Sequence, residues 1–334
     1  MERERQENQV RLISLAEGFL YANVLFALHR LGVFRLLDSG PKTLPELAAV
    51  MGCDEHRLMR ALRGGLVTRL LEVDHENRYQ VSGVVKDTLG PAADPSLDAW
   101  MWFLYSVQPA ICQLDKTVLS GQPIFHFFSQ LNQAEIRQFS LAMHNYAKSR
   151  GADLPNFLDL SGYKTLLDVG TGPGTYAFEL AAKYRQLEIS LLDLPSVLEV
   201  AKEIEAHYSL ENQPHYLPLD FGREEIPGKY DVVLVSNTLH TIGPASSRAL
   251  LKRLYSNVNS AGCLVVQAQF IPDHQPATRC WPVVFDLILM SITPTGENHG
   301  LNETIEWLKE AGFLNVASCR MSLLNTNSYV IGYR

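Results

Sequence analysis

The stretch Leu166–Gly174, with the sequence LLDVGTGPG, decides the fold of this chain. An apolar run ends in an acid and a close-packed glycine turn, and the residues from Thr175 to Lys183 that follow have the apolar spacing of a helix. We therefore predict a strand, a tight turn and the start of a helix. Glycine at three alternating positions lets the backbone adopt positive φ and approach a ligand closely, because no Cβ stands in the way. This pattern is typical of a nucleotide-type binding site.

The details of the turn favour one kind of nucleotide. A dinucleotide fingerprint has the spacing G-x-G-x-x-G, whereas here the third glycine comes one residue early and Asp168 precedes the turn. A carboxylate there disfavours a pyrophosphate, which argues against an NAD dehydrogenase. It favours S-adenosylmethionine, which carries an ammonium and a sulfonium group and no phosphate. A second acid, Asp193, ends the next apolar run, where such folds hold ribose hydroxyls. The two acids and the turn predict a bound adenosine cofactor, and a purely structural turn with solvated acids is the alternative.

Composition limits the class of protein. A chain of 334 residues exceeds what one core usually holds, so two domains are expected. No window approaches about 18 uninterrupted apolar residues, so no transmembrane helix is predicted. The N-terminal residues lack the apolar region of a signal peptide, and the five scattered cysteines form no CxxC pair, so a cytoplasmic location is expected. The net charge of −7 argues against broad affinity for nucleic acid or anionic membranes.

Residues 1–95 have a winged-helix pattern. Apolar groups recur at helical spacing from about residue 10 to 37, with Gly32 as a break, and Thr43 and Asp54 are predicted to cap two short helices. Residues 71–81 read as a hairpin. The apolar first helix needs a partner, so we expect this domain to form a homodimer.

A winged helix also invites a DNA-binding hypothesis. Arg57, Arg60 and Arg63 recur at i, i+3 and i+6, so they form one basic stripe that would suit a phosphate backbone. A solvated helix face explains the same stripe, and the acidic chain favours that explanation.

Residues 96–155 form a predicted helical connector rich in aromatic side chains. Trp102 and Phe103 belong to a dense group that continues beyond the Gly121–Pro123 break, and a helix is expected from Glu135 to Ser149. Such a group packs as core, lines an apolar pocket for a flat substrate, or does both.

Residues 156–334 alternate strands and helices. Strands are expected at 187–192, 215–218, 230–236, 263–270, 316–321 and 328–333, with helices at 197–207, 246–257 and 303–311. This order predicts an α/β fold with a mostly parallel, doubly wound sheet that becomes antiparallel at its end. Ligands of such sheets bind at the carboxyl ends of the strands.

Five stretches together resemble one family. They are 167–174 (LDVGTGPG), 192–195 (LDLP), 219–221 (LDF), 236–240 (SNTLH) and 307–313 (WLKEAGF). The chain resembles the S-adenosylmethionine-dependent small-molecule O-methyltransferases of the caffeate and hydroxyindole type, including bacterial members of natural-product pathways. The resemblance covers nearly the whole chain and implies a winged-helix dimerisation domain, a helical connector and a class I, Rossmann-like methyltransferase domain.

The resemblance also implies roles for individual residues. The expected cofactor contacts are Asp168, Gly170, Gly172, Asp193, Leu194, Asp220, Phe221 and Ser236. The expected substrate contacts are Trp102, Phe103, Met143, Phe285, Met290 and Asn298. His240 matches the family's general base.

The proposed base limits the acceptor. Proton transfer from a phenol of pKa about 10 to an imidazole of pKa about 6.5 costs about 5 kcal/mol, whereas transfer from an alcohol would cost about 13 kcal/mol. Phenols and enols are therefore the favoured acceptors. The acids that often accompany the base in this family are replaced by Thr241, Ala268 and Asn298, although Glu297 is adjacent to the last of these. Alternatives therefore stay open: C-methylation of an α-keto acid through a metal held by His240, His299 and Glu297, a rearrangement or hydroxylation, or cofactor binding without turnover.

Overall fold

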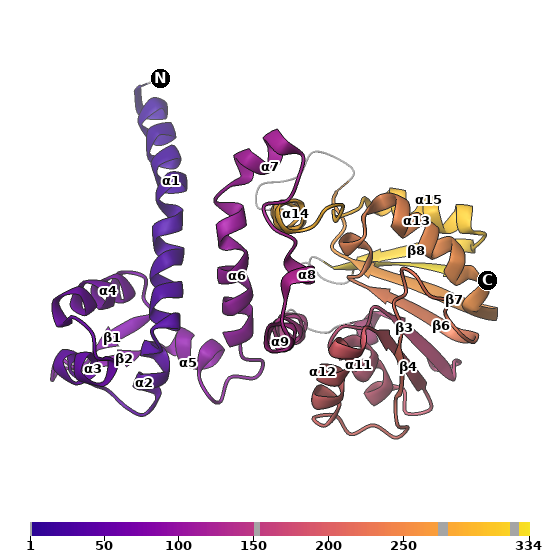
Figure 1. Cartoon of the computed structure of the whole chain (residues 1–334), viewed down its shortest axis with the longest axis horizontal. Coiled ribbons are helices and arrows are strands. Elements are labelled where there is room, and N and C mark those ends of the chain that lie inside the picture. Colours follow the sequence, from indigo (N-terminus) through magenta and orange to yellow (C-terminus); the bar gives the residue numbers. More distant parts are fainter. Residues whose placement is uncertain (1, 150–153, 273–279, 321–326) are drawn as a thin grey trace. The chain divides into compact units, whose positions relative to one another are not determined.

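The structure is a computed structural model that describes residues 2–149, 154–272, 280–320 and 327–334. The chain divides into two compact units, Met1–Met101 and Trp102–Arg334 (Figure 1). The first unit contains the predicted winged-helix region. The second unit contains most of the predicted connector together with the cofactor-binding region.

The first unit has the predicted order of elements. It contains α1 (Glu2–Arg30), α2 (Val33–Asp38), α3 (Leu44–Met51), α4 (Glu55–Val67), β1 (Leu71–Val73), β2 (Tyr79–Val81) and α5 (Gly83–Leu89). Both predicted caps are confirmed, since the Thr43 side chain accepts from the backbone N–H of Glu46 and Asp54 accepts from that of Arg57. β1 and β2 pair antiparallel as the wing. The winged-helix prediction is therefore confirmed.

Helix α1 leaves most of its apolar side chains exposed. Only Phe26 and Leu28 of this helix are buried. The exposed apolar surface of α1 consists of Val10, Leu12, Ile13, Leu15, Phe19, Leu20 and Tyr21, each 52–72% exposed, and these side chains surround the helix. By length and composition alone α1 is apolar enough to cross a membrane, although polar residues interrupt its apolar ones. An exposed apolar surface of this size equally suits a partner protein.

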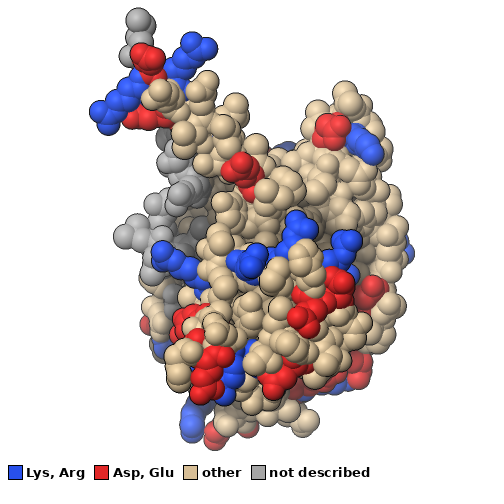
Figure 2. Space-filling model, turned by 90° about the vertical axis from the view of Figure 1, so that its left-hand side faces the viewer, with Lys and Arg blue, Asp and Glu red and all other residues tan. Residues whose placement is uncertain are grey.

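Charges of both signs occur on the surface drawn in Figure 2. Figure 2 shows acidic side chains lying among the basic ones, over the face that it draws. Such mixing weakens the attraction of any one basic stripe for a phosphate backbone.

The second unit begins with helices and continues as an α/β domain. Helix α6 (Asp98–Ile111) spans the division between the units, and α7 (Leu114–Ser120), α8 (Phe127–Gln130), α9 (Gln133–Ser149) and α10 (Leu154–Phe157) follow. The α/β part contains β3 (Thr165–Val169), α11 (Thr175–Lys183), β4 (Glu188–Asp193), α12 (Pro195–Glu205), β5 (His215–Pro218), β6 (Tyr230–Ser236), η1 (Leu239–Thr241), α13 (Gly243–Leu254), η2 (Tyr255–Asn257), β7 (Val258–Ala268), α14 (Trp281–Ile292), α15 (Leu301–Ala311), β8 (Leu314–Arg320) and β9 (Ser328–Tyr333).

Most predicted strands match these bounds. The strand predicted at 263–270 instead begins at Val258 and ends at Ala268. The last residue of the strand predicted at 316–321 lies outside the described residues. Helix α14 has no counterpart in the sequence prediction, because a nearly continuous apolar run does not reveal its periodicity.

The seven-stranded sheet has the order β5-β4-β3-β6-β7-β9-β8. The first five strands in this order are parallel, and β9 pairs antiparallel with both β7 and β8. This confirms the predicted doubly wound sheet with an antiparallel end. The carboxyl ends of the parallel strands therefore meet at one edge, and the predicted cofactor residues Asp168, Asp193 and Ser236 lie there.

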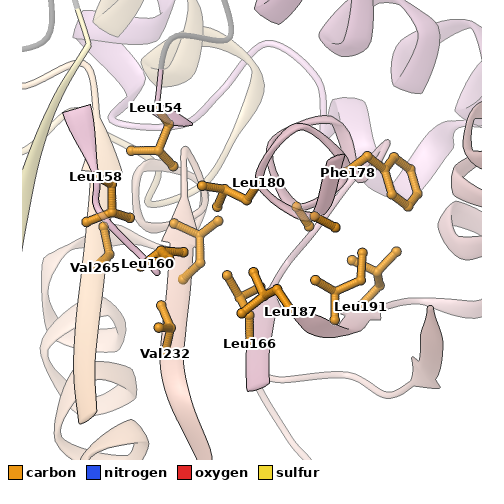
Figure 3. Packing of buried hydrophobic residues seen from close by; sticks show 14 of the residues in the cluster. Leu154, Leu158, Leu160, Leu166, Phe178, Leu180, Leu187, Leu191, Val232 and Val265 are labelled. Atoms are coloured by element: carbon orange, nitrogen blue, oxygen red, sulfur yellow. The ribbon is translucent and has the colours of Figure 1, made fainter. Parts of the chain in front are cut away.

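Alternate residues of the central strands face two separate cores. Leu166, Val232 and Val265 pack with α11 and α12 on one face (Figure 3). Leu167 and Val233, one residue later in their strands, pack with α13 and α15 on the other. Because both faces are covered, the strands are continuous apolar runs, which explains why the sequence located them well.

Candidate functional site

The three glycines of the turn after β3 have different neighbours. All three have positive φ, at 67° for Gly170, 55° for Gly172 and 76° for Gly174. A Cβ on Gly170 would lie 2.5 Å from Thr238 Cγ2, and one on Gly174 would lie 2.5 Å from the ring of Phe178. A Cβ on Gly172 would have no neighbour within 4 Å. The outer two glycines therefore allow close packing, and only Gly172 offers open backbone to a ligand.

Asp193 is hydrogen-bonded to the backbone beside this turn. Its carboxylate accepts from the N–H of Gly172 at 2.8 Å and from the N–H of Leu194 at 2.7 Å. Burial raises the pKa of Asp193, although both hydrogen bonds act in the opposite direction. Each carboxylate oxygen can accept a second hydrogen bond, so the residue suits a pair of ligand hydroxyls.

Asp168 lies buried under the turn with one oxygen unpaired. Oδ2 accepts from the Thr171 hydroxyl at 2.6 Å, whereas the buried Oδ1 has no hydrogen-bond partner among the described residues. Burial raises the pKa of Asp168 to about 7, and the charge of Asp193 also raises it. A cationic group would satisfy Oδ1 and favour the ionised carboxylate. This site therefore fits the ammonium and sulfonium charges of S-adenosylmethionine.

The remaining predicted cofactor residues lie at the same edge of the sheet. Asp220 follows β5 and accepts from the N–H of Gly222 at 2.9 Å. The ring of Phe221 comes within 3.3 Å of the position of a Cβ on Gly170, so it lies beside the glycine turn. Leu194 is 48% exposed, and the Ser236 hydroxyl donates to Gln267 Oε1 at 3.3 Å.

Thr238 is a site residue that sequence reasoning missed. Its hydroxyl lies 3.1 Å from the carbonyl oxygen of Val169 and 3.2 Å from that of Gly170, and its methyl group packs against Gly170. Thr238 thus joins the glycine turn to the segment that carries His240. Thr238 lies in the stretch 236–240 that resembles the family, but the resemblance implied no role for it.

His240 lies in the short helix η1 and is surrounded by apolar and neutral groups. Burial, together with a smaller contribution from the neighbouring His299, lowers the pKa of His240 to about 4. The His240 ring makes an edge contact with Phe285, with 5.6 Å between the ring centroids. Its Nδ1 is buried and has no hydrogen-bond partner among the described residues. The imidazole is therefore neutral at pH 7 and is a weaker base than an exposed histidine.

His299 contacts the backbone before His240. Its Nε2 lies 3.3 Å from the carbonyl oxygen of Leu239 and 3.3 Å from the Ser247 hydroxyl, which donates to the same carbonyl at 3.0 Å. The His299 ring also packs on Trp307. These contacts fix the turn that carries His240.

The hypothesis that a neighbouring acid compensates for the missing ones is not supported. Glu297 is exposed and makes no hydrogen bond with His240 Nδ1. Asn298 is buried, and its amide donates to the Pro282 carbonyl at 2.7 Å. Nor do His240, His299 and Glu297 converge: among the described residues, no group of three His, Cys, Asp or Glu side chains has the geometry to hold a metal ion. The hypothetical metal site is thus not formed by these residues.

The predicted substrate residues fall into two groups. Phe103 is 2% exposed and packs edge-on against Phe127 and Phe139, whereas Trp102 is half-buried at the border of this cluster. The others are the half-buried Met143 on α9, Phe285 and the half-buried Met290 on α14, and Asn298 after it. Of these, Phe285 is the one that the structure places against His240.

Comparisons with known proteins agree with this fold. A family model described as an O-methyltransferase domain matches residues 111–314, and one described as an O-methyltransferase dimerisation domain matches residues 13–86. A 3-hydroxy-5-methyl-1-naphthoate 3-O-methyltransferase from Streptomyces sahachiroi is 24% identical, over 97% of this chain and 94% of the relative. An L-tyrosine C(3)-methyltransferase from Streptomyces lavendulae is 26% identical, over 75% of this chain and 71% of the relative.

Solved structures share the whole fold. Human N-acetylserotonin methyltransferase, solved in complex with S-adenosylmethionine, has a TM-score of 0.86 at 22% identity, over 98% of this chain and 97% of that one. The fold and the glycine-turn site define a class I, cofactor-binding methyltransferase with an added winged-helix domain. The chain belongs to the O-methyltransferase family, whose members use S-adenosylmethionine.

Proposed function

We propose that this O-methyltransferase acts on a phenolic or enolic hydroxyl of a small aromatic compound, with His240 as the general base. The observation that carries the proposal is the link through Thr238, which ties the turn bearing His240 to the glycine turn. A proton acceptor next to the cofactor site is what hydroxyl methylation requires.

The cofactor is held by the edge of the sheet. Asp193 suits the ribose hydroxyls, Phe221 the adenine ring, and Gly172 and Asp168 the methionine end with its cationic groups. When bound, S-adenosylmethionine supplies an electrophilic methyl group on a sulfonium, which leaves as a neutral thioether. Ser236 lies near the same end and contributes a hydroxyl.

The weak basicity of His240 narrows the acceptor. A phenol of pKa about 10 and an imidazole of about 4 differ by about 6 pKa units, or about 8 kcal/mol. An aliphatic alcohol would leave a gap of about 16 kcal/mol, which no ordinary positioning effect offsets. The best acceptors are therefore hydroxyls more acidic than phenol itself, such as enols and phenols conjugated to a carbonyl group. The Streptomyces sahachiroi relative is named for a naphthoate hydroxyl, which supports a fused aromatic acceptor.

The apolar groups around His240 support an aromatic acceptor. Phe285 presents its ring to His240, and Met143, Met290 and Trp102 are half-buried side chains of the same unit. Such side chains suit a flat apolar molecule. In this proposal Phe103, within the aromatic cluster, supports the side chains that contact the acceptor, and Asn298 fixes the loop after α14.

Labelled methyl transfer tests the function. The purified protein is incubated with S-adenosylmethionine carrying an isotopic methyl group and with small-molecule extracts and simple phenols, and label is located by mass spectrometry and NMR. A labelled aryl or enol ether is the expected product. Replacing His240 by Ala should lower kcat at least about a hundredfold while the Kd for S-adenosylhomocysteine changes less than about twofold. Full activity of this variant would refute the base assignment.

A second candidate is methylation of a ring carbon next to a phenol. It is favoured by His240 Nδ1, which has no carboxylate partner in the described part of the chain, and by the similarity to the tyrosine C(3)-methyltransferase named above. Label bonded to carbon in the NMR spectrum would select this reaction.

We also propose that the protein is a cytoplasmic homodimer whose chain has three functional parts, at 1–95, 96–155 and 156–334. The exposed apolar surface of α1 and the match to a dimerisation domain support the dimer. The five cysteines are free, which suits a reducing compartment.

A further inference from the structure

Four uncharged polar side chains extend one core of the sheet toward the cofactor edge. They are Gln267 at the end of β7, Gln269 just beyond it, Tyr146 on α9 and Tyr176 on α11, and we call them the amide cluster. Gln267 has no exposed surface and Gln269 is 6% exposed. Glutamine is rarely buried to this extent unless its amide has partners.

The two glutamines point to the same side of the sheet. Cys263 and Val265 of β7 belong to the core shown in Figure 3, and side chains alternate along a strand, so Gln267 and Gln269 continue that face. Gln269 Nε2 lies 3.3 Å from the Tyr146 hydroxyl. Gln267 Oε1 accepts from the Ser236 hydroxyl at 3.3 Å.

Each glutamine has one amide atom left over. Gln269 Oε1 and Gln267 Nε2 are buried, and neither has a partner in hydrogen-bond geometry among the described residues. Gln267 lies beside Tyr176, and its amide therefore acts to lower the pKa of the Tyr176 hydroxyl. Buried polar atoms without partners are costly, and a ligand that satisfies them explains why they are kept. The free acceptor is therefore Gln269 Oε1, while the Gln267 amide N–H is directed toward the Tyr176 hydroxyl, and a ligand that donates to Gln269 complements the cluster.

The cluster carries no charge. Amides do not titrate, and burial raises the pKa of Tyr176, so its hydroxyl stays protonated. Lys148, two residues after Tyr146, is paired with Glu179 at 2.8 Å. The two amides and two phenols of the cluster themselves offer no cation to a carboxylate or phosphate, so their chemistry suits a neutral group with both a donor and an acceptor.

The cluster lies beside the proposed reaction site. Tyr146 is three residues after Met143 and lies on the same side of α9. Gln267 contacts Ser236, two residues before Thr238, which packs on the glycine turn. None of these residues is shared with the contacts proposed for the adenosine part of the cofactor.

We propose that the amide cluster binds a neutral hydrogen-bonding substituent of the methyl acceptor, a carboxamide or a hydroxyl, and so selects acceptors that carry one. This inference rests on the proposed function. Gln269 is then a specificity-determining residue that touches the acceptor away from the methylated oxygen.

Three matched naphthols test the selection. They carry a hydroxyl at carbon 3 and a carboxamide, a methyl group or a carboxylate at carbon 1. For the wild type we expect kcat/KM for the amide to exceed that for the methyl compound about tenfold, with the carboxylate the poorest. In Gln269→Met the preference for the amide should fall to within about twofold, because the side chain keeps its length and loses its hydrogen bonds. Gln186→Met, which changes an exposed amide elsewhere in the unit, is the control and should keep the wild-type preference.

Two further measurements separate the explanations. The Kd for S-adenosylhomocysteine should be unchanged in Gln269→Met, and a tenfold increase would mean that the cluster serves the cofactor and would overturn the proposal. The ligand-free variant should be at least as thermally stable as the wild type, because a half-satisfied buried amide is removed. A clear fall in Tm would show a structural role and would also overturn it. If the wild type neither binds nor methylates any of the naphthols, the aromatic acceptor class fails, and the Tm comparison still decides on the cluster.

Discussion

Replacing Gly172 by Ala should separate the role of the glycine turn in folding from its role in binding. Both Gly170 and Gly172 have positive φ, which costs an alanine about 1–2 kcal/mol. A Cβ on Gly172 meets no neighbour within 4 Å, so for Gly172→Ala this backbone strain is the whole expected cost. For a unit of this size the Tm should fall by roughly 2–8 °C.

Gly170→Ala is the matched control. Its Cβ would lie 2.5 Å from Thr238 Cγ2, and the overlap should add about 1–3 kcal/mol to the same backbone strain. The total of about 2–5 kcal/mol predicts a fall in Tm of roughly 4–20 °C. Thermal unfolding of the two variants without ligand should therefore show the larger loss at Gly170.

The cofactor product should stabilise Gly172→Ala less than it stabilises the wild type. At a concentration of 100 times its Kd, S-adenosylhomocysteine stabilises the wild type by about 2.7 kcal/mol. If the Gly172 methyl group occupies space that the ligand needs and weakens binding tenfold, the stabilisation falls to about 1.4 kcal/mol at the same concentration. Calorimetric titration gives the Kd directly. A Gly172→Ala variant that binds S-adenosylhomocysteine as tightly as the wild type would refute the reasoning, because the ligand would then not approach this backbone.

Four other predictions concern the site and α1. The pKa of Asp168 is raised from 3.8 to about 7, so protonation of this carboxyl favours the folded state at low pH. This contribution to the free energy of unfolding, about 4 kcal/mol, should be lost as pH rises from about 4 to 7. Asp168→Asn should abolish this pH dependence in denaturant titrations at several pH values. Binding of S-adenosylmethionine at pH 6.5 should release protons through Asp168, seen by calorimetry in buffers of different ionisation enthalpy, and equal heats in all buffers would contradict this. Phe19→Asp should turn the dimer into a monomer in light scattering, because the 61% exposed ring belongs to the exposed apolar surface of α1; a dimer that persists would place the interface elsewhere. Ser247→Ala, which removes a hydrogen bond to Leu239, should lower kcat about three- to tenfold at unchanged cofactor Kd, and an altered Kd would assign the serine a wider structural role.

The parts of the fold that the sequence predicted are those fixed by local chemistry. The caps at Thr43 and Asp54 depend on side chains three residues from the N–H groups they satisfy, so a short stretch contains the whole interaction. The central strands were visible because both faces of the sheet are covered. Helix α14 was missed for the opposite reason, since its apolar run has no polar face to mark a period.

The site was predictable only in part. The glycines and acids lie at fixed places in a strand-turn-helix pattern, whereas Thr238 and the amide cluster join residues far apart in the chain. The low pKa of His240 also needs the fold, because it arises from burial and from His299, 59 residues away. The energy gap between base and acceptor is therefore larger than the value expected from an exposed imidazole. The sequence identified the groups, and the structure determined their strength.

The position of β9 has a consequence for how the second unit opens. Strand β9 lies between β7 and β8 in the sheet, and β8 is the edge strand that pairs with β9. Any fluctuation that detaches β9 from β7 therefore releases both strands together as one hairpin. Their amide protons should exchange with solvent water at similar rates, as one cooperative segment, while those of β3 and β6 are protected for longer.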